Sequence, residues 1–281
     1  MDRAVEKAIE CIWERYSEPL SLAEIAESVL LSRFYFARLF RDATGITPGR
    51  FLAAIRIHQA KLLLLSSSAS IADVAAAVGY NSLGSFTNYF TASVGFSPGR
   101  FRRLAQTGRF GLPSPQPNGR TGSGAVAGTI SLPDGHGHAR VFVGAFPTPI
   151  VQYPPVAGVI VDVPAGRPCC HHLTDVPEGT WFVRAVGVAA GVGPDPSSQR
   201  TSLVGSYDSV TVIAGSITSA ALRLRQPRRD DPPILLALPD LAPPAVPAVL
   251  SGCPVITPRP APARQRPTGD LTGPAAGSPR S

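Results

Sequence analysis

Two sets of side chains, fifty residues apart, have the types that contact base edges in the major groove of DNA. The first set follows the i, i+3, i+4, i+7 spacing of one helix face and consists of Phe34, Ala37, Arg38 and Arg41. The second set has the same spacing and consists of Gly84, Thr87, Asn88 and Thr91. Arginine forks onto guanine, asparagine pairs with adenine, and an apolar side chain packs against the thymine methyl group. Two stripes in register favour base contacts over the alternative, in which they are the solvated surface of a small helical bundle.

The segments that carry these stripes repeat each other. Residues 45–51 (GITPGRF) recur fifty residues later as GFSPGRF. Upstream of each copy, Ser21 and Ser70 are followed three residues later by an acid, which is the capping-box spacing that begins a helix. A second helix is predicted over about residues 32–44 and again over 82–94. The sequence therefore predicts two helix-turn-helix units, each with a recognition helix.

Arg33 and Ser85, which lie beside the two stripes, complete the candidate DNA-binding set. Between the two units, Pro48 suits the first position of a longer helix. About eighteen residues at about 1.5 Å each give this helix a length of about 27 Å. With the widths of the flanking units, that length suits two recognition helices about one DNA turn, or about 34 Å, apart.

Apolar residues at helical spacing predict the core of residues 1–107. The expected core positions include Phe36, Leu39, Phe40, Ala43, Ile55, Leu63, Val74, Phe86 and Phe90. We expect this core to be complete without the rest of the chain, so that the region folds and binds DNA alone.

Charge along the chain supports contact with phosphate. The whole chain carries a formal net charge of +7. Residues 1–31 hold three basic and seven acidic side chains, whereas residues 32–110 hold ten basic and two acidic ones. A basic surface that begins at the first predicted recognition helix is typical of nucleic-acid binding. The candidates for phosphate contacts are Arg33, Arg41, Arg50, Arg100, Arg102 and Arg103.

Residues from about 5 to 104 resemble the DNA-binding domain of AraC/XylS-type transcriptional regulators of bacteria. The positions that carry the resemblance include Ala26, Arg38, Leu39, Phe40, Gly45, Pro48, Ile71, Ala72, Asp73, Val74, Ala75, Val78, Gly79, Tyr80, Gly95, Ser97 and Pro98. The resemblance implies a regulator whose positions Phe34, Ala37, Arg38, Gly84, Thr87 and Asn88 face base edges of double-stranded DNA. RNA polymerase and a small effector are further candidate partners. Unlike most members, this chain has no basic residue between Leu83 and Val94, and it carries the DNA-binding domain first.

The remainder of the chain predicts a linker, a β domain and a tail. Glycine, proline and Asn-Gly turn signals over residues 108–124 predict a flexible linker. Short β-type runs within 125–240 predict an antiparallel β-sandwich; they cover 139–146, 156–163, 181–189, 209–214 and 217–224. Residues 176–185 resemble a strand-turn-strand element of prealbumin-like or carboxypeptidase-regulatory-like modules. Residues 241–281 are dominated by proline and are expected to be disordered.

A cluster of potential metal ligands lies in the predicted β domain. Cys169, Cys170, His171 and His172 are consecutive, and His136 and His138 precede them. Thiolates and imidazoles suit zinc or copper, but adjacent strand residues alternate faces and no C-x-x-C spacing is present. We therefore expect no metal and no other cofactor. Four cysteines in a reducing compartment also argue against a disulfide framework.

No catalytic motif is present, since the sequence lacks G-x-S-x-G, H-E-x-x-H, a phosphate-binding loop and a dinucleotide fingerprint. No signal peptide is expected, and no apolar run approaches about 18 residues. The sequence therefore predicts a cytoplasmic protein without catalytic residues and without a membrane partner. Two alternatives to a sequence-specific regulator stay open. One is a metal- or ligand-sensing regulator that acts through the β domain, and the other is an architectural DNA-binding or interaction protein.

Overall fold

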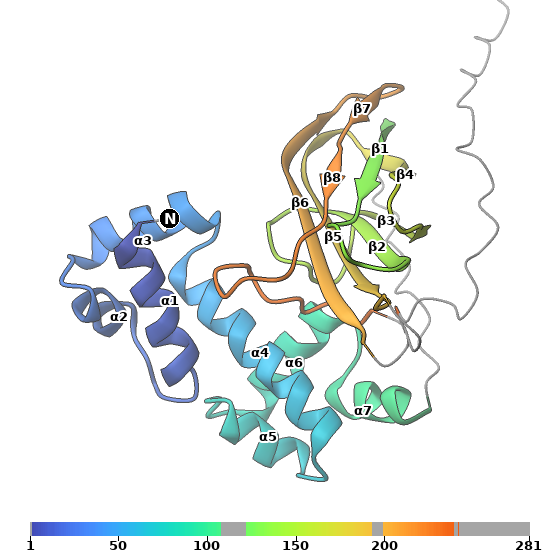
Figure 1. Ribbon diagram of the computed structural model, residues 1–281. Helices are drawn as coiled ribbons and strands as arrows, with labels where there is room; N and C mark the ends of the chain where they lie inside the picture. Colours follow the sequence, from blue (N-terminus) through green and yellow to red (C-terminus); the bar gives the residue numbers. More distant parts are fainter. Residues whose placement is uncertain (1, 108–121, 193–198, 239–240, 242–281) are drawn as a thin grey trace, which may run out of the picture. The chain divides into compact units, whose positions relative to one another are not determined.

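The computed structural model describes residues 2–107, 122–192, 199–238 and 241 (Figure 1). Within these residues, helices occupy the first range and strands the later ones. The helices are α1 (Arg3–Arg15), α2 (Leu22–Ser28), α3 (Arg33–Thr44), α4 (Pro48–Ser66), α5 (Ile71–Ala77), α6 (Leu83–Val94) and α7 (Pro98–Thr107). Most of the expected linker, residues 108–121, and the expected tail beyond Leu241 lie outside the described residues. No helix among the described residues is long and apolar enough to cross a membrane.

The helices α3 and α6 begin and end at equivalent residues, fifty positions apart. The hydroxyls of Ser32 and Ser82 cap the two N-termini by accepting a backbone N–H three residues later. Each helix ends at a glycine in the left-handed conformation, Gly45 with φ 76° and Gly95 with φ 92°. These bounds agree with the predicted recognition helices.

The shorter helices α2 and α5 also begin as predicted. Ser21 forms a complete capping box with Glu24, whose carboxylate accepts the serine N–H at 2.8 Å. Ser70 forms the same arrangement with Asp73. Each capping box satisfies two backbone donors that would otherwise lack partners at the helix start.

Aromatic rings fill the interior of the helical region in two series of contacting rings, which lie fifty residues apart in the sequence. In the first, centroids are 5.6 Å apart for Phe36 and Phe40 and 5.5 Å apart for Phe40 and Phe51. In the second, the corresponding distances are 5.6 Å for Phe86 and Phe90 and 5.7 Å for Phe90 and Phe101. All six rings are buried. The predicted core is confirmed at these positions, but Leu39 and Leu63 are only partly buried and Ala43 is exposed.

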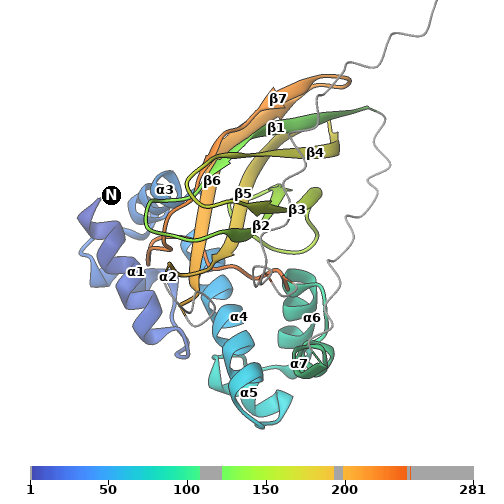
Figure 2. The ribbon, with the colours of Figure 1, turned by 45° about the vertical axis from the view of Figure 1, so that its right-hand side comes forward.

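Two four-stranded sheets follow the helices in sequence. One is antiparallel throughout, in the order β3 (Ala157–Val163), β2 (Ala139–Phe146), β5 (Gly179–Ala189), β6 (Thr201–Val212). The other has the order β4 (Cys169–Pro177), β1 (Ser123–Ser131), β7 (Ile217–Ser219), and β8 (Leu222–Arg223) also pairs with β1. Residues of both sheets share one buried cluster, so the sheets pack against each other (Figure 2).

The second sheet differs from the sequence prediction in two ways. Its strands β1 and β4 were not expected, and β1 pairs in parallel with both β7 and β8. Sheet structure dominated by antiparallel pairs is therefore confirmed, but a wholly antiparallel arrangement is wrong. Parallel pairing here joins strands that lie about ninety residues apart in the chain, which no local turn signal reveals.

The buried core of the helical region includes residues from beyond it. Ile150 comes from the β2–β3 connection (residues 147–156), and Leu235 and Ala237 come from the C-terminal strap (residues 224–238) that follows β8. The expectation that this core is complete within residues 1–107 is therefore wrong. The division into domains at the predicted boundaries stays a prediction.

Candidate nucleic-acid interface

The predicted DNA-contact residues of α3 lie on the side of the helix opposite its buried phenylalanines. Phe36 and Phe40 are fully buried, whereas Phe34, Arg38 and Arg41 are exposed. Ala37 lies between them and is partly buried. Phe34 keeps 74% of its surface exposed, so it is available to a partner.

Cations lie over two exposed rings at the start of α3. The guanidinium carbon of Arg33 is 4.7 Å from the centroid of the Phe34 ring, and that of Arg38 is 5.8 Å from the centroid of Tyr35. Such cation–π contacts contribute about 0.5–1 kcal/mol at exposed sites and restrict the guanidinium to fewer orientations. Both arginines remain exposed and their charged heads can reach a polyanion.

The helix α6 presents the second predicted set with the same alternation. Gly84, Ser85 and Asn88 are exposed, and Thr87 and Thr91 are partly buried. Burial along residues 83–90 matches that along 33–40 position by position. The hydroxyl of Thr91 donates to the carbonyl of Thr87 at 2.7 Å, so this side chain is tied to its own helix. In contrast to α3, this surface offers neutral groups only.

One predicted phosphate contact is wrong. Arg102 is partly buried, and its Nε donates to the carbonyl of Leu64 at 3.2 Å while Nη2 donates to that of Ala69 at 2.7 Å. These carbonyls flank the turn between α4 and α5, so Arg102 stabilises this turn. The sequence signal for phosphate contact, a run of arginines after the second unit, does not distinguish Arg102 from its exposed neighbour Arg103.

Arg56 has an equivalent role at the turn between α1 and α2. Its Nε donates to the carbonyl of Tyr16 and its Nη2 to that of Glu18, both at 2.7 Å. Burial lowers the pKa of this guanidinium, and the carbonyls compensate for the lost water. From α3 to α7, the basic side chains that are exposed in the described residues are Arg33, Arg38, Arg41, Arg50, Arg100 and Arg103, and α1 adds Arg3 and Lys7.

The C-terminal ends of both predicted recognition helices lie against the same β2–β3 connection. A Cβ atom added at Gly45 would lie 2.8 Å from Cγ of Pro149, and one added at Gly95 would lie 3.0 Å from the Tyr153 ring. The N–H of Tyr153 also donates to the carbonyl of Ser93 at 2.8 Å. Pro149 and Tyr153 are four residues apart, so one short segment contacts the ends of α3 and α6.

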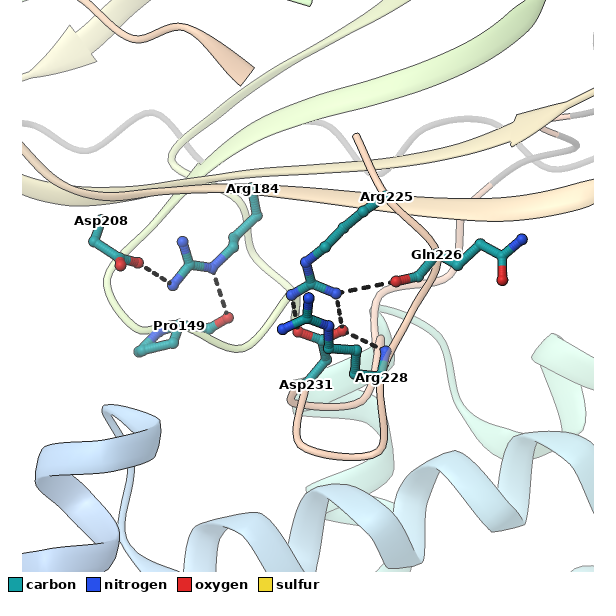
Figure 3. Close-up of polar contacts among 7 residues, drawn as sticks. All are labelled: Pro149, Arg184, Asp208, Arg225, Gln226, Arg228 and Asp231. Atoms are coloured by element: carbon teal, nitrogen blue, oxygen red, sulfur yellow. Dashed lines mark hydrogen bonds and ion pairs between the residues drawn. The ribbon is translucent and has the colours of Figure 1, made fainter. Parts of the chain in front are cut away.

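Arg184 of β5 supports this connection from the sheet side (Figure 3). Its Nε donates to the carbonyl of Pro149 at 3.1 Å, and its Nη2 forms an ion pair with Asp208 at 3.1 Å. Burial lowers the pKa of Arg184, whereas Asp208 acts in the opposite direction. The side chain therefore links the antiparallel sheet to the segment that contacts Gly45.

The C-terminal strap is held by a second arginine (Figure 3). Both terminal nitrogens of Arg225 contact the carboxylate of Asp231, and the backbone N–H of Arg228 donates to the same carboxylate at 2.7 Å. Further along, the N–H of Ala237 donates to the carbonyl of Val94 at 3.0 Å, at the end of α6. The strap is thereby fixed at its turn and at the helical core.

The consecutive cysteines and histidines at 169–172 lie in strand β4. His171 is buried, and its Nε2 lies 2.7 Å from the carbonyl of Ala220. Burial lowers the pKa of this imidazole. Cys170 is disulfide-bonded, contrary to the expectation from the cysteine count, and Cys169 is free. Among the described residues, no three His, Cys, Asp or Glu side chains are grouped so that they could hold a metal ion.

Residues 25–104 match the family described as "Helix-turn-helix domain". The melibiose operon regulatory protein of Escherichia coli (strain K12) is 31% identical over 109 residues, which cover 39% of this chain and 36% of that protein. The uncharacterized HTH-type transcriptional regulator YfiF of Bacillus subtilis (strain 168) is 36% identical over 93 residues, which cover 33% of this chain and 29% of that protein. The bifunctional transcriptional activator/DNA repair enzyme AdaA of the same organism is 29% identical over 102 residues, which cover 36% of this chain and 48% of that protein.

Two solved structures match part of this chain. The AraC-type transcriptional regulator from Chromobacterium violaceum has 26% identity and a TM-score of 0.36, and the match covers 41% of this chain and 95% of that one. The DNA-binding domain of AdpA, solved in complex with a target DNA, has 28% identity and a TM-score of 0.36, over 37% and 95%. The chain spans about a third of the length of the first curated relatives it matches. Its residues 25–104 thus match a helix-turn-helix family, and the relatives that share this segment are transcription regulators of bacteria.

Proposed function

We propose that this protein is a sequence-specific DNA-binding transcriptional regulator of the AraC type. In this proposal α3 and α6 enter successive major grooves of double-stranded DNA. The observation that carries it is the identical burial of residues 33–40 and 83–90 within a segment that matches a helix-turn-helix family. Two equivalent helices that expose equivalent positions are what a monomer needs to read two half-sites.

The roles of individual residues follow from their exposure and chemistry. Phe34 and Arg38 of α3 and Asn88 of α6 contact bases, while Ala37, Gly84 and Thr87 allow close approach. The edges of the two surfaces contact the sugar-phosphate backbone of DNA through Arg33, Arg41, Ser85 and Thr91. Because the charged groups are on α3 alone, this helix supplies most of the affinity.

The rest of the proposal concerns the whole chain. Residues 1–107 form the DNA-binding domain, although β1 already begins at Ser123 within the expected linker and Leu241, at the start of the expected tail, is buried. Residues 125–240 form a β-sandwich of the prealbumin-like type that regulates rather than catalyses. The protein acts in the cytoplasm, with RNA polymerase and a small effector as its further partners.

Selection of bound sequences from a random DNA pool by the full chain tests the proposal. We expect a discrete motif with two parts about one helical turn apart. The Arg38→Ala variant should lose base preference in one part, whereas the matched change Arg3→Ala, on the acidic helix α1, should leave the motif unchanged. Recovery of random sequences by the wild-type chain would favour an architectural DNA-binding protein instead, as would diffuse coverage in a footprint.

A further inference from the structure

The C-terminal strap enters the interior without regular secondary structure. Its residues 232–235 belong to neither a helix nor a strand, yet Leu235, Leu236 and Ala237 are each at most 2% exposed. Backbone groups that are buried outside helices and sheets need other hydrogen-bond partners, because an unpaired buried carbonyl costs about as much as a lost hydrogen bond. The partners of this segment therefore show what holds it in place.

Two side chains of α4, one turn apart, bond to the strap carbonyls. The ammonium of Lys61 is withdrawn from solvent and donates to three consecutive carbonyls, those of Ile234 and Leu235 at 3.0 Å and that of Leu236 at 3.2 Å. The imidazole of His58 also has a hydrogen bond with the backbone of Ile234. An aliphatic side chain at position 61 would fill similar space but would leave the three carbonyls without this donor. Lys61 therefore fixes the conformation of the strap as well as its position.

Stability alone does not explain this lysine. Lys61 has no ion pair with a carboxylate in the parts of the chain that the structure describes. Burial lowers its pKa from 10.5 to about 8, because the charged form is deprived of water. Hydrogen bonds to neutral carbonyls offset such a loss only in part. The lysine is better explained by the conformation that its three bonds impose on the strap.

The same part of the strap holds the β2–β3 connection. The backbone N–H groups of Leu235 and Leu236 donate to the carbonyl of Val151 at 2.8 and 2.9 Å. Val151 is midway between Pro149 and Tyr153, the residues that contact the ends of α3 and α6. The strap is thus bonded to the midpoint of the segment that joins the two predicted recognition helices.

The strap is also attached on both sides of this segment. Arg225 pairs with Val204 of β6 through two backbone hydrogen bonds, at 2.8 and 2.9 Å. The carbonyl of Arg229 accepts a hydrogen bond from Trp13 of α1 at 3.2 Å, and the far end of the strap bonds to Val94 of α6. The strap thereby joins the antiparallel sheet to α1, α4 and α6.

We infer that the strap is a clasp: held on α4 by Lys61, it locks the β2–β3 connection so that the two predicted recognition helices keep one relative position. In this locked state Phe34, Arg38 and Asn88 are exposed, so it is the state that binds DNA. Release of the strap leaves the two units joined by α4 but free to move at their C-terminal ends. The effect on DNA rests on the proposed function, whereas the locking is a property of the free protein and can be measured on it.

Amide hydrogen exchange of the full chain, without DNA, tests the locking. In Lys61→Met the amides of Leu235 and Leu236 should exchange about tenfold faster, since their segment has lost its anchor. The amide of Tyr153, which bonds to α6, should accelerate to a similar extent, whereas the amides of β5 should be unchanged. Lys7→Met, on the exposed surface of α1, is the matched control and should change none of these rates.

His58→Phe is a milder second variant, because it keeps a ring beside Trp13 but loses the bond to Ile234. It should raise the same exchange rates about threefold, and it decides alone if Lys61→Met does not fold. Circular dichroism and unchanged exchange in β5 show that a variant is folded. An unchanged rate at Tyr153 in the folded variants would overturn the inference, because the strap would then be a local contact that locks nothing.

The effect on DNA is measured with the selected two-part site and with a shortened site that keeps only the part read by α3. A fixed arrangement gives the second unit a high effective concentration, so the wild type should bind the complete site about a hundredfold more tightly than the shortened one. In Lys61→Met this gain should fall about tenfold, while the affinity for the shortened site should not change. An equal or larger gain in Lys61→Met would overturn the clasp as an aid to DNA binding.

Failure of the regulator and failure of the clasp give different results. A wild-type chain that selects no DNA motif would refute the regulator, and the exchange rate at Tyr153 would still decide whether the strap locks the connection. A chain that selects a motif, but whose Tyr153 amide is insensitive to Lys61→Met, would keep the regulator and lose the clasp.

Discussion

The backbone N–H of Tyr153 donates to the carbonyl of Ser93 at 2.8 Å, which joins the β2–β3 connection to the last turn of α6. Four residues earlier, Pro149 lies against Gly45 at the end of α3. The glycines that end the two predicted recognition helices therefore have a second role beyond helix termination. They also leave room for a segment that contacts both helices.

Gly45→Ala should destabilise the protein by about 1–3 kcal/mol, because a left-handed φ of 76° strains alanine and its Cβ would lie 2.8 Å from Pro149. Gly49→Ala is the control, since a Cβ there meets nothing within 4 Å and the residue is helical. Denaturant midpoints measure both variants, and the control should be neutral or slightly stabilised. Equal losses in the two variants would exclude the contact with Pro149 as the cause.

Arg38→Ala should weaken binding to the selected DNA site by about 1–3 kcal/mol, as expected for loss of a bidentate base contact. Asn88→Ala should cost less and relax specificity at one end of the site only, since α6 has no basic residue to support it. Gel-shift titrations of both variants against matched and mutated sites measure the difference. A larger loss for Asn88→Ala would show that the second unit dominates.

Arg102→Gln and Arg103→Gln should have different effects despite being neighbours. Arg103 is exposed, so its loss should reduce the slope of log affinity against log salt by about 0.9, the value for one phosphate contact. Arg102 bonds to Leu64 and Ala69, so its loss should lower the free energy of unfolding by about 1–3 kcal/mol and leave the slope unchanged. For the wild-type chain we expect a slope of about −3.5 to −4.5, from four to five phosphate contacts. A reduced slope in Arg102→Gln would restore it as a phosphate contact.

Lys61 should make stability depend on pH in the alkaline range. Burial lowers its pKa from 10.5 to about 8 in the folded protein. Between these values the unfolded chain binds more protons than the folded one, so the free energy of unfolding should rise with pH through this window. Below pH 8 both states are protonated and the cost of the buried ammonium is fully present; this cost, about 3 kcal/mol, is relieved as the pH rises to 10.5. Denaturant unfolding curves of the wild type and of Lys61→Met, measured from pH 7 to 11, isolate the effect of Lys61. If the free energy of unfolding changed with pH in the same way in both proteins, this prediction would be wrong.

The local features of the helical region could be predicted from the sequence because their signals are short-range. Ser32 and Gly45 mark the ends of α3 by side-chain type alone, and the spacing of Phe36 and Phe40 identifies its buried face. The exposure of Phe34 follows from that spacing. For the same reason, the candidate surface on α6 was found without knowledge of its surroundings.

The features that the sequence did not reveal depend on contacts between distant residues. β1 (SGAVAGTIS) is rich in glycine and alanine, so it lacks the β-branched and aromatic residues that identify strands. The role of Arg102 depends on carbonyls at Leu64 and Ala69, which only the folded chain brings near. The burial of Ile150 and Leu235 in the helical core has the same origin.

The contact of one short segment with both Gly45 and Gly95 has a consequence for the operators that such a protein could use. Each base pair added between two half-sites rotates one relative to the other by about 34–36°, since B-DNA has about 10–10.5 base pairs per turn. Two recognition helices joined by a flexible linker could reorient to match that rotation. Two recognition helices held together at their C-terminal ends could not, so their DNA site would tolerate a substituted base pair better than an inserted one.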